Sequence, residues 1–182
     1  VGADYFLEDG AALAFAPDFS FADLAAYLSP VPVLPVSASR GCYWRRCLFC
    51  PEAASPSHPY GAYPGAFVEL LRGLATRYGV HHFHLTDNAL PVGILQELAA
   101  QSQAMAGLGW HGFVRFEKEL LDRDFVRGLA ANGCRMLQLG LESGSQAVLD
   151  RLQKGTRVEQ VARMLDNLHG AGIRTYVYVM LG

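Results

Sequence analysis

Apolar positions along the chain follow two spacings, one typical of helices and one typical of strands. Apolar residues three or four apart predict four helices, which begin near residues 67, 91, 122 and 156. Short apolar or β-branched runs predict five strands, at 31–37, 82–86, 112–116, 135–141 and 174–180. Strands and helices alternate, which predicts an α/β fold with parallel strands and right-handed crossovers.

Local signals indicate where the predicted helices begin and end. Pro91 stands at the start of the second helix, Asp122 can cap the third, and Gly133 follows the end of the third. Thr156, with Glu159 three residues later, has the pattern of a capping box for the fourth helix. The loops between these elements are therefore the segments left to carry chemistry.

Polar or reactive residues follow the carboxyl ends of four predicted strands. They are Cys42, Asp87 with Asn88, Arg115 with Glu117, and Glu142 with Ser143. The carboxyl ends of parallel strands converge on one edge of a sheet or barrel, so these residues are expected to share a site. The first strand is followed by no Gly-x-Gly-x-x-Gly turn, which disfavours a dinucleotide-binding sheet. Element order alone leaves open a doubly wound sheet, a barrel, or part of a barrel.

The composition predicts one main domain. The chain has 182 residues and 51% apolar content, enough for one core. Residues 1–36 contain four prolines and are interpreted as an entry segment, while residues 37–182 form the core domain. The sequence begins at Val1 and stops at Gly182, directly after a predicted strand. We therefore expect an internal segment of a longer protein.

Charge and hydropathy exclude some classes of partner. The net charge is −2 and the basic residues are scattered, which disfavours nucleic-acid binding. No apolar run is long enough to cross a membrane. The expectation is a cytoplasmic protein that binds neither nucleic acid nor membrane.

Three of the four cysteines lie close together, which indicates a metal site. Cys42, Cys47 and Cys50 fall within nine residues, and thiolates suit iron–sulfur clusters and zinc. Structural zinc normally takes four ligands in two pairs, and here the second pair is missing. A cubane cluster held by three thiolates keeps one iron open, so a cluster is favoured over zinc or structural thiols. Cys134 stands alone and is expected to be a buried apolar side chain.

The cysteine segment resembles the signature of the radical S-adenosylmethionine (radical SAM) superfamily, in which three cysteines hold a [4Fe–4S] cluster. The usual spacing is Cys-x3-Cys-x2-Cys with an aromatic residue before the last cysteine, and Phe49 matches that residue. The first gap here holds four residues, Tyr43 to Arg46, one more than usual. This form resembles a variant in cobalamin-domain members linked to the maturation of peptide natural products.

Further segments resemble the same superfamily in the same order. Residues 84–88 resemble its second-strand end, residues 139–156 its fourth-strand segment, and residues 176–182 its fifth strand. The resemblance thus covers about residues 36–182. It implies a partial (β/α)6 TIM-like barrel that is truncated after the fifth strand.

The resemblance also implies which side chains contact the cofactors. Cys42, Cys47 and Cys50 would ligate the cluster, and the residues assigned to SAM are Phe49, Asp87, Asn88, Glu142, Ser143 and Lys154. Glu142 would accept hydrogen bonds from the ammonium or ribose, Lys154 would pair with the carboxylate, and Phe49 would pack near the adenine. The plainer alternatives are helix caps for Asp87 and Ser143 and a solvated surface for the other charged groups.

Four more charged residues are candidates for a role at the site. Arg115 and Glu117 point at the shared mouth of the sheet and are candidates to touch the substrate. Arg45 and Arg46 either raise the potential of the cluster or form a solvated loop face, and the second is favoured.

The function implied is that of a radical SAM enzyme, either a cobalamin-associated methyltransferase or an enzyme that modifies peptides. A cobalamin domain would have to precede Val1. A flavodoxin or ferredoxin would supply electrons, and the substrate would be a small molecule or a peptide. The alternatives are a zinc-stabilised binding module and a ferredoxin-like electron-transfer domain, neither of them catalytic.

Overall fold

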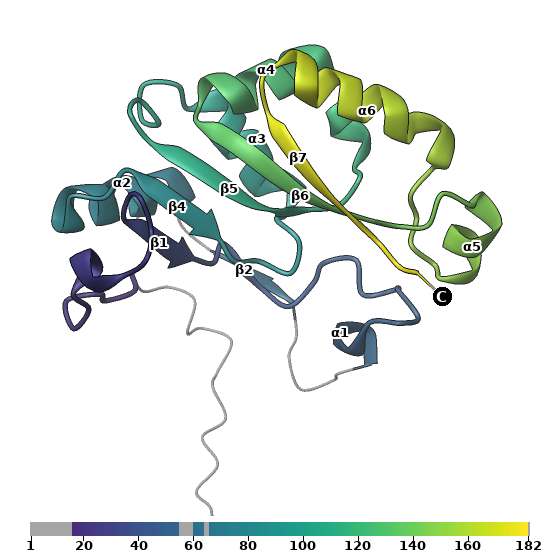
Figure 1. Ribbon diagram of the computed structural model, residues 1–182, viewed down its shortest axis with the longest axis horizontal. Helices are drawn as coiled ribbons and strands as arrows, with labels where there is room; N and C mark the ends of the chain where they lie inside the picture. Colours follow the sequence, from purple (N-terminus) through teal and green to yellow (C-terminus); the bar gives the residue numbers. More distant parts are fainter. Residues whose placement is uncertain (1–15, 55–59, 64–65, 182) are drawn as a thin grey trace, which may run out of the picture.

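A five-stranded parallel sheet forms the centre of the computed structural model, which describes residues 16–54, 60–63 and 66–181 (Figure 1). The strand order is β1-β4-β5-β6-β7. These strands are β1 (Val33–Val36), β4 (His82–Leu85), β5 (Gly109–Val114), β6 (Cys134–Glu142) and β7 (Arg174–Val179). Every neighbouring pair is parallel, which confirms the α/β class predicted from the alternation of elements.

Helices connect the strands and cover one side of the sheet (Figure 1). They are α2 (Phe67–Tyr78), α3 (Val92–Ala100), α4 (Arg123–Ala131) and α6 (Val158–Gly170). Shorter elements complete the described chain: η2 (Leu24–Ala26), β2 (Ser39–Arg40), α1 (Pro51–Ala54), β3 (Gly61–Ala62), η3 (Lys118–Leu121) and α5 (Gln146–Arg151). β2 and β3 pair antiparallel as a separate small sheet beside the cysteine segment.

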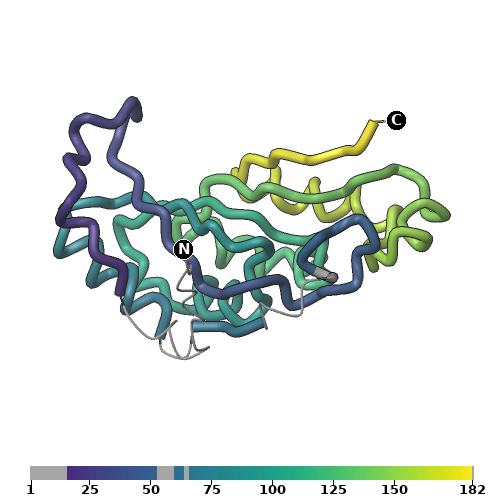
Figure 2. Tube along the Cα trace, turned by 90° about the horizontal axis from the view of Figure 1, so that it is seen from below, coloured from purple at the N-terminus to yellow at the C-terminus, as the bar shows by residue number. Residues whose placement is uncertain are grey.

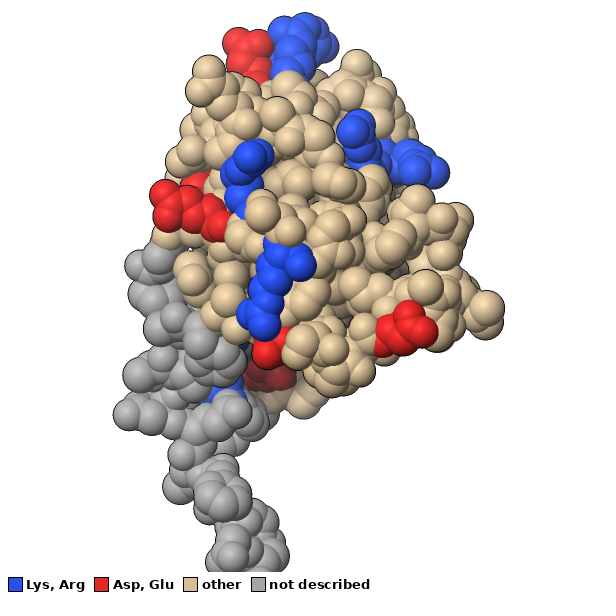
Figure 3. Space-filling model, turned by 90° about the vertical axis from the view of Figure 1, so that its left-hand side faces the viewer, with Lys and Arg blue, Asp and Glu red and all other residues tan. Residues whose placement is uncertain are grey.

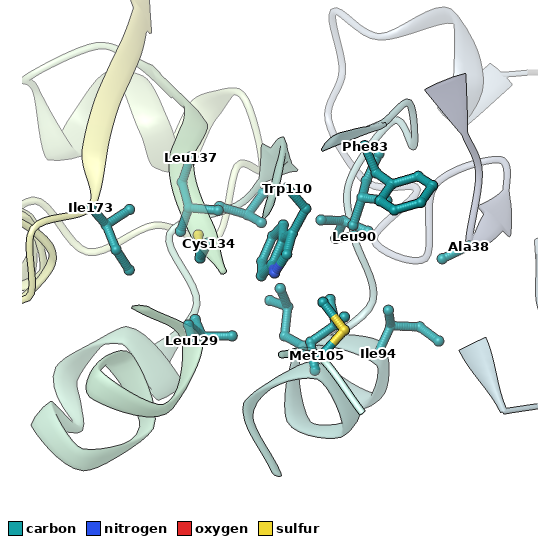
Figure 4. Packing of buried hydrophobic residues seen from close by; sticks show 14 of the residues in the cluster. Ala38, Phe83, Leu90, Ile94, Met105, Trp110, Leu129, Cys134, Leu137 and Ile173 are labelled. Carbon is teal, nitrogen blue, oxygen red and sulfur yellow. The ribbon is translucent and has the colours of Figure 1, made fainter. Parts of the chain in front are cut away.

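The core lies between the sheet and these helices. Trp110, Phe83 and Leu137 are fully buried, and Trp110 points toward the helical layer, where Leu129 of α4 lies (Figure 4). The indole Nε1 of Trp110 donates a hydrogen bond to the carbonyl of Asn132 at 3.0 Å, so this large side chain leaves no donor unpaired. This packing fixes the strands, and with them the loops at their carboxyl ends.

The opposite face of the sheet carries less buried side chains, as strand alternation requires. His84 and His111 are neighbours in register on β4 and β5, and their rings stack with centroids 4.5 Å apart. Burial and the nearby histidines lower the pKa of His111 below its ordinary value. Protonation of this side chain is therefore opposed in the folded protein.

Most of the predicted boundaries are close to the observed ones, and one cap is wrong. Asp122 caps α4 as expected, because its carboxylate accepts the N–H groups of Asp124 and Phe125. The capping box of Thr156 and Glu159 does not form. The side chain of Gln146 accepts the Val158 N–H instead, and the buried Thr156 hydroxyl has no hydrogen-bond partner in the described part of the chain.

The entry segment proves partly structured where it can be described. Residues 1–15 lie outside the described residues, and Val33–Val36 forms β1, which pairs with β4. Among the residues that the structure describes, no helix is both long and apolar enough to span a membrane. On the face shown in Figure 3, charged side chains of both signs are interspersed with uncharged ones.

Candidate functional site

A cavity of about 360 Å³ lies at the carboxyl ends of the strands and is bordered by the cysteine segment. It is lined by Cys42, Cys47, Phe49, Cys50, Pro51, Glu52, Asn88, Ala89, Phe113, Arg115, Glu142 and Lys154. The cysteine segment lies at the same end of the molecule as α5 and the end of β7 (Figures 1 and 2). The predicted site residues that do not line this cavity are Asp87, Glu117 and Ser143.

The three clustered cysteines are free thiols. Cys47 is buried, Cys42 and Cys50 are half-buried, and the Cys50 N–H donates to the Cys47 carbonyl at 3.1 Å to form a tight turn. Within the described residues, no group of three Cys, His, Asp or Glu side chains is close enough to hold a metal ion. An iron–sulfur cluster takes its thiolates on different irons, so its ligands surround a volume. Three soft thiol donors around one cavity fit that requirement.

Glu142 and Lys154 form a buried ion pair in the wall of the cavity. The Lys154 Nζ lies 2.9 Å from Glu142 Oε1, and the side chains are 5% and 11% exposed respectively. Glu142 has a φ of +68°, a left-handed conformation that is costly for a residue other than glycine. A Cβ at Gly140 would lie 2.6 Å from Glu142 Oε1, so only glycine fits beneath this pair. Strain and close packing at this point indicate a position that the fold specifically maintains.

The β6 strand is irregular where Glu142 stands. Its pairing with β7 shifts register between Gly140 and Glu142, which marks a bulge. The Lys154 ammonium also lies 5.8 Å from the centre of the Phe49 ring. The bulge therefore directs the Glu142 carboxylate toward the lysine and the cysteine segment.

Asp87 and Asn88 separate at the end of β4. Asn88 lines the cavity, whereas Asp87 accepts hydrogen bonds from the Ala38 N–H at 3.0 Å and from the Ser39 hydroxyl. Burial raises the pKa of Asp87 above its ordinary value. The alternative of a helix cap is wrong, because α3 begins after Pro91 and has no side-chain cap. Asp87 instead fixes the chain just before the cysteine segment.

Ser143 does not cap α5, because the N-cap of that helix is Ser145 and has no side-chain cap hydrogen bond. The Ser143 hydroxyl accepts the Ser145 N–H at 3.1 Å, in the turn that leads into α5. The side chain is half-buried and does not line the cavity.

Arg115 and Trp44 form a contact that sequence reasoning missed. The Arg115 guanidinium lies 4.2 Å from the centre of the Trp44 ring, and Arg115 is only 4% exposed. Trp44 occupies the unusually long first gap between the cysteines, so an aromatic residue in that gap was the available signal. Arg46, favoured as part of a solvated face, is indeed exposed and stacks on the same ring at 5.2 Å.

Glu117 completes this group of side chains. It accepts a hydrogen bond from Arg115 Nε at 2.9 Å and another from the Tyr43 hydroxyl at 2.6 Å. Burial and the bond to Glu117 raise the pKa of Tyr43. Arg115 and Glu117 thus lie at the expected edge of the sheet but serve the cysteine segment directly.

Cys134 lies apart from the cavity, at the start of β6. It is 2% exposed and packs in the core, as predicted. Burial raises the pKa of its thiol, which keeps it in the neutral form.

Comparison with known proteins gives one family and several similar folds. The model of the Radical SAM superfamily matches residues 36–182, more than half of the chain. No curated protein matches. The structure of a radical S-adenosylmethionine methyltransferase, TsrM from Kitasatospora setae, with cobalamin and a [4Fe–4S] cluster bound, superimposes with a TM-score of 0.67 at 22% identity. That match covers 84% of this chain and 31% of the other.

Two further structures share the fold at lower identity. The cobalamin-dependent S-adenosylmethionine radical enzyme OxsB, with aqua-cobalamin bound, gives a TM-score of 0.62 at 20% identity, over 82% of this chain and 24% of the other. Methylornithine synthase, PylB, gives 0.57 at 14% identity, over 82% and 44%. The chain therefore spans less than half the length of each of these proteins.

Proposed function

Because the chain belongs to the radical SAM superfamily, we propose that Cys42, Cys47 and Cys50 hold a [4Fe–4S] cluster and that SAM binds beside it. The observation that carries this proposal is the shared cavity, into which three thiols and the Glu142–Lys154 pair all face. When bound, the cluster supplies the electron that cleaves SAM to methionine and a 5′-deoxyadenosyl radical.

The side chains of the cavity have separate tasks in this proposal. Lys154 occupies one oxygen of the Glu142 carboxylate, and the second oxygen can accept hydrogen bonds from the ammonium or ribose of SAM. Asn88 offers an amide to the same ligand, and Phe49 offers an apolar surface for the adenine. Asp87 and Ser143 act indirectly, by shaping the segments around the cavity. Arg115, Glu142 and Lys154 are buried, so water is excluded from that wall of the cavity.

The finer function belongs to the same proposal. The parallel sheet would be most of a (β/α)6 barrel, and the enzyme would be a cobalamin-associated methyltransferase or a peptide-modifying enzyme. The TsrM and OxsB structures bind cobalamin, which supports a cobalamin domain preceding Val1. We further propose a flavodoxin or ferredoxin as reductant and a small molecule or peptide as substrate. The cytoplasmic location remains a prediction.

Anaerobic reconstitution with iron and sulfide tests the cluster. The purified protein should turn brown and bind about four irons per chain. Alanine at Cys42, Cys47 or Cys50 should abolish stable iron binding, whereas Cys134→Ala is the matched control and should keep it. Stoichiometric zinc with no iron uptake would instead support the zinc-stabilised module.

Electron paramagnetic resonance separates the enzyme from a ferredoxin-like domain. Adding SAM to the reduced protein should change the spectrum, because SAM binds next to the cluster. The Glu142→Gln variant should need more SAM for the same change. A spectrum indifferent to SAM in a protein with four irons would favour electron transfer.

A further inference from the structure

Arg115 is a buried arginine, and each of its three side-chain nitrogens has a partner. Nε donates to Glu117 Oε1 at 2.9 Å, Nη2 donates to the Lys154 carbonyl, and Nη1 lies 3.9 Å from the Cys47 sulfur. Its planar face stacks on Trp44. Only a flat, forked cation can make these contacts together, which distinguishes arginine from lysine here. A residue held in this way is poorly placed to bind a substrate.

The charges around Arg115 have a definite direction. Glu117 neutralises the guanidinium overall, but it binds the Nε side, whereas Nη1 faces Cys47. The positive end of the ion pair is therefore directed at the sulfur and the negative end at the Tyr43 hydroxyl. Because Arg115 is 4% exposed, water and salt screen this field less than at the surface.

Trp44 holds the guanidinium in this place. Its Nε1 donates to the Gln153 carbonyl at 2.8 Å, and its ring packs so closely on Gly155 that a Cβ there would lie 2.3 Å from it. The Leu48 N–H donates to the Leu152 carbonyl at 3.1 Å, so the segment between the cysteines is bound to residues 152–155 at two points. The longer first gap thus supplies the aromatic surface on which Arg115 rests.

We propose that Arg115 is a positioning residue for the cluster, which it serves by directing an N–H group at the Cys47 sulfur, with Trp44 keeping it there. Hydrogen bonds to the sulfurs and nearby positive charge stabilise the reduced cluster and raise its reduction potential. This inference rests on the proposed function, since it requires a cluster on Cys47. The inference attributes the rise in the reduction potential of the cluster to Arg115, and it attributes no such rise to the exposed Arg46.

A redox titration followed by electron paramagnetic resonance tests the inference. Arg115→Gln should keep its iron and shift the midpoint potential to a more negative value, and Arg115→Lys should shift it less, because it keeps the charge. Arg46→Gln removes the same formal charge from the exposed partner of Trp44, and its potential should equal that of the wild type. A wild-type potential in Arg115→Gln, or an equal shift in Arg46→Gln, overturns the inference.

Glu117→Gln should shift the midpoint potential in the opposite direction, and it serves as a second test if Arg115→Gln does not fold. Removing this carboxylate leaves the guanidinium uncompensated, so the potential should become less negative, while the Tyr43 hydroxyl still has an acceptor. If Arg115→Gln does not fold, this variant decides, and an unchanged or more negative potential refutes the proposal. A purely structural role predicts no such reversal of sign. Wild-type protein that binds no iron refutes the proposed function and this inference together, whereas iron-loaded variants with unaltered potentials refute the inference alone.

Discussion

Removing one partner of the buried Glu142–Lys154 pair should destabilise the fold strongly. At 2.9 Å, with an effective dielectric constant of about 20, the Coulomb attraction is roughly 6 kcal/mol. Most of that attraction offsets the cost of burying two charges, so the net contribution of the pair is small. Lys154→Met, however, leaves the Glu142 carboxylate buried without its partner. The expected loss is about 3–5 kcal/mol in the free energy of unfolding.

Urea unfolding of the cluster-free protein, followed by circular dichroism, measures this loss. A change of that size moves the midpoint by about 2 M for a typical slope. The double variant Glu142→Gln/Lys154→Met should lose less than Lys154→Met alone, because no charge is left unpaired. Arg127→Met is the control, since the Arg127–Asp124 pair has side chains 69% and 89% exposed and should contribute less than about 0.5 kcal/mol. A Lys154→Met shift no larger than that control would refute the reasoning.

Four more substitutions test the packing at two glycines and the pKa shifts of two side chains. Gly155→Ala should destabilise the protein by about 1–3 kcal/mol and change the fluorescence of Trp44, because the new Cβ would overlap the Trp44 ring. Gly73→Ala has free space around it inside α2 and should stabilise the protein by up to about 1 kcal/mol in the same urea assay. Because the pKa of Asp87 is raised, the folded protein loses stability as the pH rises from the ordinary 3.8 through the raised value. Asp87→Asn should therefore flatten that part of the curve of stability against pH. An unchanged slope would contradict this prediction. The lowered pKa of His111 has the opposite sign: stability is present above its ordinary 6.5 and is lost as pH falls through the lowered value. His111→Gln should therefore resist mild acid better than the wild type, as measured by thermal unfolding at about pH 5 and pH 7.5.

The sheet could be predicted from the sequence because its determinants are local. Alternation of strand and helix patterns fixes parallel strands, and parallel strands bring residues 42, 88, 115 and 142 to one edge. The capping box predicted for α6 does not form, because the acceptor of the Val158 N–H is Gln146. That residue lies twelve positions earlier, outside the range of a capping-box pattern.

The roles within the site depended on distant partners and could not be predicted residue by residue. Asp87 binds backbone and hydroxyl groups 49 and 48 residues away. The Trp44–Gln153 hydrogen bond spans 109 residues, and the Arg115–Cys47 contact spans 68. A pattern of residue types shows that charged groups share an edge, but only packing decides which of them touch.

The long separation between Trp44 and Gln153 also sets an order of events during synthesis. The cysteine segment leaves the ribosome well before the residues that pack around it, which are Arg115, Glu142 and Gly155. At about 5–20 residues per second, the interval between Cys50 and Gly155 is roughly 5 to 20 seconds. For the first part of that time the three thiols lack Arg115, and for all of it Trp44 lacks Gln153 and Gly155, the residues against which it packs. Metal that bound during this interval would bind an unfolded cysteine segment. Correct insertion of a cluster is therefore expected only after the segment around residue 155 has left the ribosome.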